Sequence, residues 1–196
     1  MINQTEVIEF FNRCAPSWDA EMVRSDEKIS VILDNAGVRC GSRVLDVACG
    51  TGVLIPDYLS RGVSSVTGID ISCEMIRIAE SKFSRDNVRF ICGDAEKDDV
   101  GTDYDAIVIY NAFPHFPEPE RLIRRLSRLL APEGILTVAH GAGREKIDAH
   151  HKGTASAVSV GLMPADELAE LFSGYLDVMT VLSTDDIYQV AGKKPS

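Results

Sequence analysis

The chain has 196 residues, of which 45% are hydrophobic and 26% are charged, the balance of a soluble globular protein. That length fits one domain with a substantial core, so we expect residues 1–196 to fold as a single unit. The net charge of −10 disfavours nucleic acids, whose phosphates are bound mainly by Lys and Arg. No stretch approaches the roughly 20 apolar residues of a membrane span, and no targeting peptide is evident, which predicts a cytoplasmic protein.

The five cysteines are Cys14, Cys40, Cys49, Cys73 and Cys92, and they include no C-x-x-C pair. An odd number at wide spacing argues against both a disulfide framework and a zinc knuckle. We therefore expect reduced thiols. Cys49 and Cys92 are predicted to be small buried hydrophobic residues in the walls of a pocket.

Short apolar runs alternate with amphipathic segments along the chain. Residues 42–48, 65–71, 88–94, 104–110 and 134–140 are rich in Val and Ile and are predicted to be buried strands. Residues 72–84 and 118–131 are predicted to be helices. The first range opens with Ser72, a preferred helix cap, and the second carries leucines on one face and stops before Pro132. The alternation predicts right-handed βαβ units, and therefore an α/β fold whose parallel sheet has helices on both faces.

A hairpin is predicted at the end of the chain. Residues 175–182 and 186–194 both have the pattern of strands, and they flank the turn-like STDD at 183–186. The hairpin would add an antiparallel strand to the sheet, which is unusual for a dinucleotide-binding fold.

A carboxylate marks the end of each of the first three predicted strands. These are Asp46 in LDVACGTG, Asp70 in TGIDIS and Asp94 in CGDAE. Ligands of open α/β sheets bind at the carboxyl ends of the strands, so the three acids should line one edge. Their charge favours a ligand with cationic or hydrogen-bond-donating groups.

The glycine loop after the first strand narrows the choice of ligand. Gly50 and Gly52 permit a tight turn and a close approach to the backbone. A dinucleotide fingerprint has its third glycine where Ile55 stands, and Asp46 would bring negative charge near a pyrophosphate. An NAD-dependent oxidoreductase is therefore a distant alternative. S-adenosylmethionine carries no phosphate and presents ammonium, ribose and adenine donors, which suits acidic strand ends.

From about residue 5 to the final hairpin, these ordered motifs resemble those of class I S-adenosylmethionine-dependent methyltransferases. The resemblance implies a Rossmann-like, mostly parallel seven-stranded sheet of order 3214576 with the last strand antiparallel. It also implies S-adenosylmethionine as cofactor and S-adenosylhomocysteine as product. One departure is Ala48, which stands where the first motif usually has a glycine, and a small residue should be tolerated there.

The resemblance carries over to the cofactor site residue by residue. Residues 46–52 match the first motif, whose glycine loop lies under the methionine moiety. Asp70 would bind the ribose hydroxyls, and Asp94 with Ala95 would read the adenine. The implied cofactor-binding residues are Asp46, Ala48, Cys49, Gly50, Gly52, Asp70, Ile71, Asp94, Ala95, Asn111 near the methionine moiety, and Trp18.

The N-terminal segment FFNRCAPSWDAE, at 10–21, resembles the segment that precedes the core in methyltransferases of quinone biosynthesis, where it packs over the cofactor. By that resemblance, residues 1–28 form a lid to which Phe11 and Trp18 belong. The alternative is a helix that covers the edge of the sheet and holds Trp18 in its own core.

The four histidines are candidates for the acceptor side of the site. His115 follows the fourth predicted strand and His140 ends the fifth, so both should face the transferred methyl group. Residues 141–163 form a long insertion, which is typical of a lid, and it carries His150 and His151. Adjacent residues of a helix point about 100° apart, so only one of these two would face the pocket.

Three interpretations of the histidines stay open. At least one histidine acts as a general base or orients the acceptor, since a neutral imidazole can remove a proton. Alternatively, His140 and one of His150 and His151, with or without His115 or Asp148, bind a metal, although no H-x-x-x-H spacing supports this. The third interpretation leaves solvated lid histidines and a capping role for His115.

The sequence thus predicts an enzyme that transfers a methyl group from S-adenosylmethionine to a small-molecule acceptor by in-line displacement. We expect a monomer or a homodimer. The alternative is a protein of another class, which handles a metal or a metal cofactor through the histidine-rich lid. Such a protein would bind zinc, nickel or cobalt stoichiometrically and turn over no acceptor.

Overall fold

The computed structural model describes residues 3–154 and 158–196, except the side chains of residues 150–154. Its helices are α1 (Gln4–Cys14), η1 (Ala15–Ser17), α2 (Trp18–Glu21), α3 (Asp26–Asn35), α4 (Ile55–Ser60), α5 (Cys73–Lys82), η2 (Phe113–His115), α6 (Pro119–Leu129), α7 (Arg144–Thr154) and α8 (Ala165–Ser173). Its strands are β1 (Arg43–Val47), β2 (Ser65–Asp70), β3 (Val88–Cys92), β4 (Tyr104–Tyr110), β5 (Leu130–His140), β6 (Asp177–Ser183) and β7 (Tyr188–Lys193). None of the helices in these ranges is long and apolar enough to cross a membrane.

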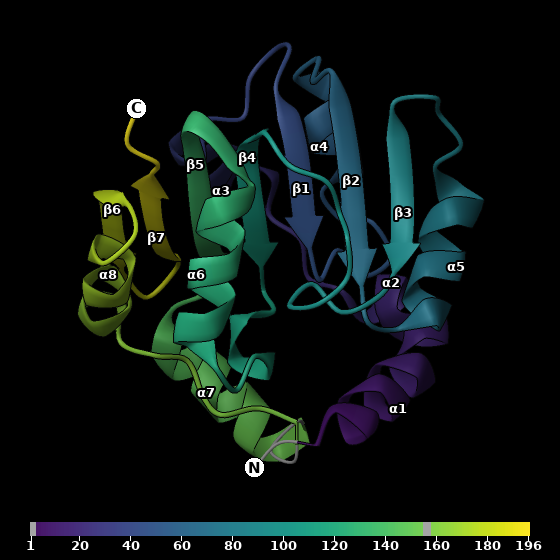
Figure 1. Cartoon of the computed structure of the whole chain (residues 1–196). Coiled ribbons are helices and arrows are strands. Elements are labelled where there is room, and N and C mark those ends of the chain that lie inside the picture. The colour runs from purple at the N-terminus through teal and green to yellow at the C-terminus, as the bar shows by residue number, and fades with distance from the viewer. Residues whose placement is uncertain (1–2, 155–157) are drawn as a thin grey trace.

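The described strands form one seven-stranded sheet in the order β3-β2-β1-β4-β5-β7-β6. Strand β7 runs antiparallel to β5 and β6, whereas the pairs among β1 to β5 are parallel. The predicted Rossmann-like order and the closing hairpin are confirmed. In Figure 1 the arrowheads of β1 to β4 point toward one edge of the sheet, and α1 and α7 lie across that edge.

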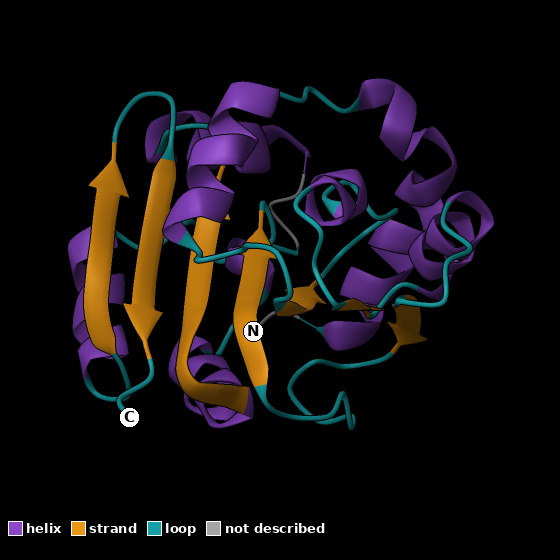
Figure 2. Ribbon diagram, turned by 90° about the horizontal axis from the view of Figure 1, so that it is seen from above, coloured by secondary structure: helices purple, strands orange, loops and turns teal. Residues whose placement is uncertain are grey.

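Helices cover both faces of the sheet, as predicted (Figure 2). On one face α6 and α8 pack against Leu45, Val47 and Ile109. On the other face α3 and α4 pack against Val44 and Val108. Successive side chains of a strand point to opposite sides, so each central strand supplies both cores. This is why these strands are apolar throughout instead of alternating with polar residues.

The largest difference from the boundaries expected from the sequence lies at the start of β5. Helix α6 ends at Leu129 and β5 begins at Leu130, whereas the strand was expected to begin at residue 134. Leu130 pairs with Tyr104 of β4, and the register then shifts before Ala106 pairs with Ile135. Pairing across such an irregularity depends on the neighbouring strand, so local periodicity does not reveal it.

The expectation of reduced cysteines is wrong at two positions. Cys73 and Cys92 form a disulfide, and both residues are exposed, so Cys92 is not the buried wall residue expected. Cys73 begins α5 and Cys92 ends β3. The helix returns the chain to the sheet and brings the two residues together, which spacing along the sequence does not reveal. Cys49 is buried, as predicted.

Candidate functional site

A cavity of about 260 Å³ lies where β1, β2 and β4 end, between the sheet edge and the N-terminal segment. It brings together most of the residues that sequence reasoning selected. Those that line its walls are Trp18, Ala48, Cys49, Gly50, Asp70, Ile71, Asp94, Ala95, Asn111 and His115. Because these residues come from six separate stretches of sequence, the parallel strands are what assemble the site.

Asp70 links the glycine loop to the start of α5. Its Oδ2 accepts a hydrogen bond from the Gly50 N–H at 2.9 Å, and its Oδ1 accepts one from the Ser72 N–H at 2.8 Å. Burial raises the pKa of Asp70 to about 6, although these two N–H groups act in the opposite direction. The carboxylate therefore holds two loops in place and also forms part of the cavity wall.

Asp94 is held from two sides at the end of β3. Its Oδ1 accepts from the Glu96 N–H at 2.8 Å, and its Oδ2 lies 2.8 Å from Lys97 Nζ. Partial burial favours the neutral acid, but hydrogen bonds from Lys97, the Glu96 N–H and Gln4 outweigh it and lower the pKa of Asp94. The carboxyl is thus ionised over the whole neutral range and is a stable hydrogen-bond acceptor.

Asp46 lies beneath the cavity and not in its wall. The residue is buried, and its Oδ2 makes no hydrogen bond within the part of the chain that the structure describes. Burial, and secondarily the charge of Asp70, raises the pKa of Asp46 well above its usual value. Its expected contact with the cofactor therefore stays a prediction.

The loop after β1 adopts left-handed backbone conformations at three positions. Gly50 and Gly52 have φ of 54° and 84°, and Ala48 has φ of 55°. A Cβ on Gly52 would lie 2.8 Å from Phe83, so this glycine is required for packing and does not line the cavity. Gly50 faces Trp18, whose Nε1 would lie 3.8 Å from an added Cβ.

Ala48 provides a prediction about stability. A left-handed conformation costs an alanine about 1 kcal/mol relative to glycine, so Ala48→Gly should stabilise the folded protein by roughly 0.5–1 kcal/mol. In a domain of this size that corresponds to a melting temperature about 2–4 °C higher at the upper end. Thermal unfolding followed by circular dichroism measures the shift, and Ala20→Gly, in the short helix α2, is the control that should not gain stability.

The N-terminal segment reaches the strand ends through two polar side chains of α1. Gln4 Nε2 donates to Asp94 Oδ2 at 2.6 Å. Asn12 Oδ1 accepts from the Ser72 hydroxyl at 2.7 Å. Both contacts fall beside the loops that follow β2 and β3, which is the placement expected of a lid.

Aromatic side chains of the same segment cover the cavity. Phe11 packs edge-on against Trp18 and against His115, with ring centroids 5.9 Å and 4.9 Å apart. Asp19, next to Trp18, accepts a hydrogen bond from Thr51 Oγ1 at 2.5 Å and so ties the segment to the glycine loop. Trp18 lies at the cavity wall, whereas the alternative interpretation placed it in a separate core.

Gln4, Arg24 and Tyr110 are among the polar wall residues that sequence reasoning missed. The Arg24 guanidinium donates to the Val53 carbonyl at 2.7 Å and to both carboxylate oxygens of Asp57 at 2.7 and 2.8 Å. Gln4 and Arg24 reach the site only through tertiary contacts, so no local pattern marks them. Tyr110 ends β4, so it could have been selected in the same way as Asp70 and Asp94, because ligands of open α/β sheets bind at the carboxyl ends of the strands.

His115 is the histidine that the structure places at the cavity. Its Nδ1 lies 2.7 Å from the Val158 carbonyl oxygen. A carbonyl only accepts, so Nδ1 carries the proton and Nε2 is the basic nitrogen of the neutral ring. The contact selects the tautomer and fixes the ring plane.

The structure does not place His140 at the cavity wall. His140 is buried beside Tyr188, with ring centroids 5.9 Å apart, and does not line the cavity. The side chains of His150 and His151, in α7, lie outside the described residues. Among the described residues, no group of three or more His, Cys, Asp or Glu side chains is arranged to hold a metal ion.

Residues 44–134 match the family described as "Methyltransferase domain". Over 139 residues the chain is 31% identical to a malonyl-[acyl-carrier protein] O-methyltransferase of Acetivibrio thermocellus, covering 69% of this chain and 49% of that protein. It is 28% identical to a ubiquinone biosynthesis O-methyltransferase of Actinobacillus pleuropneumoniae, covering 69% of this chain and 63% of the relative. The chain thus spans about half the length of several curated relatives that it matches.

A solved structure has the same fold. The N-methyltransferase NodS from Bradyrhizobium japonicum, in complex with S-adenosyl-L-homocysteine, superposes with a TM-score of 0.73 at 15% identity. The match covers 99% of this chain and 100% of NodS. At that identity the likeness concerns the fold alone. The matched family, the curated relatives and the motifs at the strand ends show that the chain belongs to the class I S-adenosylmethionine-dependent methyltransferases.

Proposed function

We propose that the cavity binds S-adenosylmethionine and that the protein transfers its methyl group to a small-molecule acceptor. One observation carries this proposal: the glycine loop, Asp70 and Asp94, which follow three adjacent strands, line a single cavity. The net charge of −10 disfavours a nucleic acid as the acceptor. The cytoplasmic location and the state of monomer or homodimer stay predictions.

The wall residues fit the groups of this cofactor. Asp70 offers carboxylate oxygens to the two ribose hydroxyls, and Asp94 and Ala95 lie at the next strand end, where the adenine amine would be read. Gly50 leaves the loop backbone open toward Trp18, because the nearest side-chain atom lies 3.8 Å from where a Cβ would stand. Asn111, exposed at the end of β4, lies on the side assigned to the methionine moiety.

When bound, S-adenosylmethionine supplies an electrophilic methyl group on a sulfonium. The protein's own contribution is to align the acceptor behind that methyl group, to exclude water and to accept the acceptor's proton. His115 is suited to the last task, since the Val158 carbonyl holds the proton on Nδ1 and leaves Nε2 basic. Phe11 packs against the ring and limits its rotation.

The acceptor side of the wall is largely apolar. Met22, Val23 and Val53 line it near Tyr110. Val23 is 94% exposed and therefore stands at the mouth, where an entering molecule would cover it. We infer an acceptor with an apolar or aromatic body and a hydroxyl, carboxyl or amine to be methylated. One relative is named for O-methylation of malonyl-[acyl-carrier protein] and another for O-methylation in ubiquinone biosynthesis, so a carboxyl and a hydroxyl are both represented among the acceptor groups to test.

The test is transfer of a tritiated methyl group from S-adenosylmethionine to a catechol, to malonyl-coenzyme A and to a primary amine. We expect one class to be labelled, and we expect His115→Gln to lower the rate by about 100-fold or more, the range for loss of a general base. The same variant should bind S-adenosylhomocysteine as tightly as wild type in calorimetry. Weakened cofactor binding with an unchanged rate at saturation would assign His115 to the cofactor instead.

A further inference from the structure

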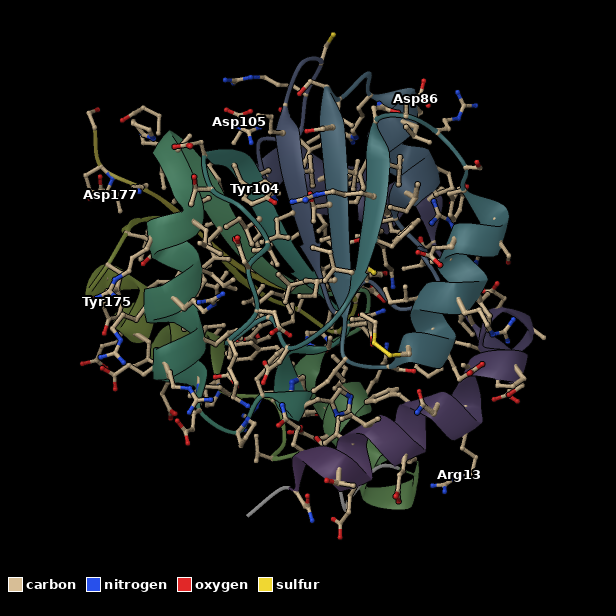
Figure 3. The ribbon with its side chains drawn as sticks, turned by 45° about the vertical axis from the view of Figure 1, so that its right-hand side comes forward. Arg13, Asp86, Tyr104, Asp105, Tyr175 and Asp177 are labelled. Atoms are coloured by element: carbon tan, nitrogen blue, oxygen red, sulfur yellow. A yellow bond between two sulfur atoms is a disulfide. The ribbon has the colours of Figure 1, made fainter. Side chains whose placement is uncertain are left out.

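The Cys73–Cys92 disulfide joins the two loops that carry the pocket carboxylates. Cys73 lies three residues after Asp70, and Cys92 lies two residues before Asp94. Asp70 pairs with Cys92 in the β2–β3 register, and the Gly93 N–H donates to the Asp70 carbonyl at 2.9 Å. Figure 3 shows the yellow sulfur–sulfur bond beside the start of α5, at the ends of β2 and β3. The covalent bond thus spans the part of the wall assigned to the ribose and the adenine.

Both cysteines are exposed, which separates this disulfide from a buried structural one. Exposed disulfides are open to attack by thiols and are the labile ones in proteins. Cys40 is also exposed but has no disulfide partner, and Cys49 is buried. The pair therefore differs from the other cysteines in being both accessible and bonded.

Apart from the disulfide and the buried Ala95, the second loop is held mainly by hydrogen bonds from side chains of other elements. Strand β3 is the edge of the sheet and pairs only with β2 among the described strands. Beyond it, the loop is tied by Gln4 to Asp94, by Arg121 to Glu96 at 2.9 Å and by the Arg125 guanidinium to the Ala95 carbonyl at 2.8 Å. The contacts made by the exposed side chains of Gln4 and Arg121 are individually weak. Removal of the covalent link should therefore loosen the loop before it affects the core.

We propose that Cys73 and Cys92 form a redox modification site, reactive toward low-molecular-weight thiols and disulfides, that sets the affinity of the cofactor pocket. The effect on cofactor affinity rests on the proposed function, whereas the thiol–disulfide exchange of the two cysteines does not. With the bond formed, Asp70 and Asp94 are held at their spacing before the cofactor binds. With the bond broken, binding must also order the Asp94 loop, which lowers the affinity.

The chemical step is thiol–disulfide exchange with a dithiol. A thiolate of the reductant attacks Sγ of Cys92, the Sγ–Sγ bond breaks, and Cys73 leaves as a thiolate that takes a proton from water. The second thiol of the reductant then closes on the mixed disulfide and releases Cys92 as a thiol. Two electrons and two protons pass to the cysteines, and the reductant becomes a cyclic disulfide. Cys73 is the better leaving group because it occupies the first turn of α5.

The experiment compares the whole chain after treatment with oxidised glutathione and after treatment with dithiothreitol. Alkylation and peptide mass spectrometry report the state of the two cysteines, and calorimetry reports the dissociation constant of S-adenosylhomocysteine. We expect the reduced protein to bind about threefold to tenfold more weakly, the cost of ordering one or two side chains on binding. Cys92→Ser should show the weaker affinity under both treatments, whereas Cys40→Ser should respond like wild type.

Two results would overturn the proposal. One is equal affinity in the two treatments when mass spectrometry shows the bond formed in one and broken in the other. The other is free Cys73 and Cys92 thiols after the oxidant. If no cofactor binds in either state, the proposed function fails separately. Hydrogen exchange of residues 93–98 then decides the redox site, with faster exchange expected in the reduced protein.

Discussion

Replacing Asp70 by Ala is expected to weaken the binding of S-adenosylhomocysteine by about 100-fold or more. Hydrogen bonds to a charged group contribute roughly 1.5–3 kcal/mol each, and a ribose diol would make two to this carboxylate. The substitution also releases the N–H groups of Gly50 and Ser72, which the carboxylate now holds at 2.9 and 2.8 Å. The glycine loop would thus lose its anchor as well as its ligand contact.

Calorimetric titration of wild type and Asp70→Ala with S-adenosylhomocysteine measures this loss. Asp86→Ala is the matched control, because Asp86 is exposed and lies at the opposite end of the sheet (Figure 3). Circular dichroism establishes that both variants are folded. If Asp70→Ala bound within about threefold of wild type, Asp70 would not be the ribose ligand, and the assignment of the wall would have to change.

The free protein is expected to lose stability as the pH rises from 4 to 7, the reverse of common behaviour. The pKa of Asp70 is about 6 in the folded state and 3.8 in its ordinary environment. The folded state therefore holds this proton more tightly, so the stabilisation is complete below pH 4 and is lost as the pH rises through 6. A shift of this size corresponds to about 3 kcal/mol at most. Asp46, whose pKa burial also raises, acts in the same direction.

Acids with lowered pKa values do not mask the expected loss of stability between pH 4 and 7. Asp94 is of that kind, and its stabilising contribution is lost only as the pH falls below its ordinary range. Wild type and Asp70→Asn contain the same histidines, which can change charge between pH 5 and 8. The informative quantity is therefore the difference in free energy of unfolding between the two proteins at each pH. Urea unfolding at pH 4.5, 5.5, 6.5 and 7.5 measures it. If the free energy of unfolding changed with pH by the same amount in both proteins, Asp70 would not be the cause of the pH dependence.

Local sequence patterns were enough to predict the α/β class and its layers, whereas the strand order was implied by the family resemblance. Apolar runs such as 104–110 match β4, and the Ser72 cap matches the start of α5. These features depend on short-range physics: side-chain periodicity, capping and the handedness of βαβ units. The Asp70 and Asp94 positions followed from the same logic, because parallel strands end at a common edge.

The contacts of the site could not be predicted in this way. Gln4 and Arg24 reach the cavity from the N-terminal segment, and neither belongs to a motif. His140 ends its strand as expected but is buried beside Tyr188, since β7 pairs with β5 and covers it. Which side of a strand end faces the ligand depends on the neighbouring elements, and the local pattern contains no record of them.

By itself, the sequence determined the α/β class, the strand order implied by its motifs and the positions of two pocket carboxylates. Only the tertiary structure decided that Asp46 is buried and does not line the cavity, that His115 does line it and that Cys73 bonds to Cys92. The physical reason is common to all three. Secondary structure follows from interactions within a few residues, whereas burial, ring orientation and cysteine pairing depend on which distant segments pack together.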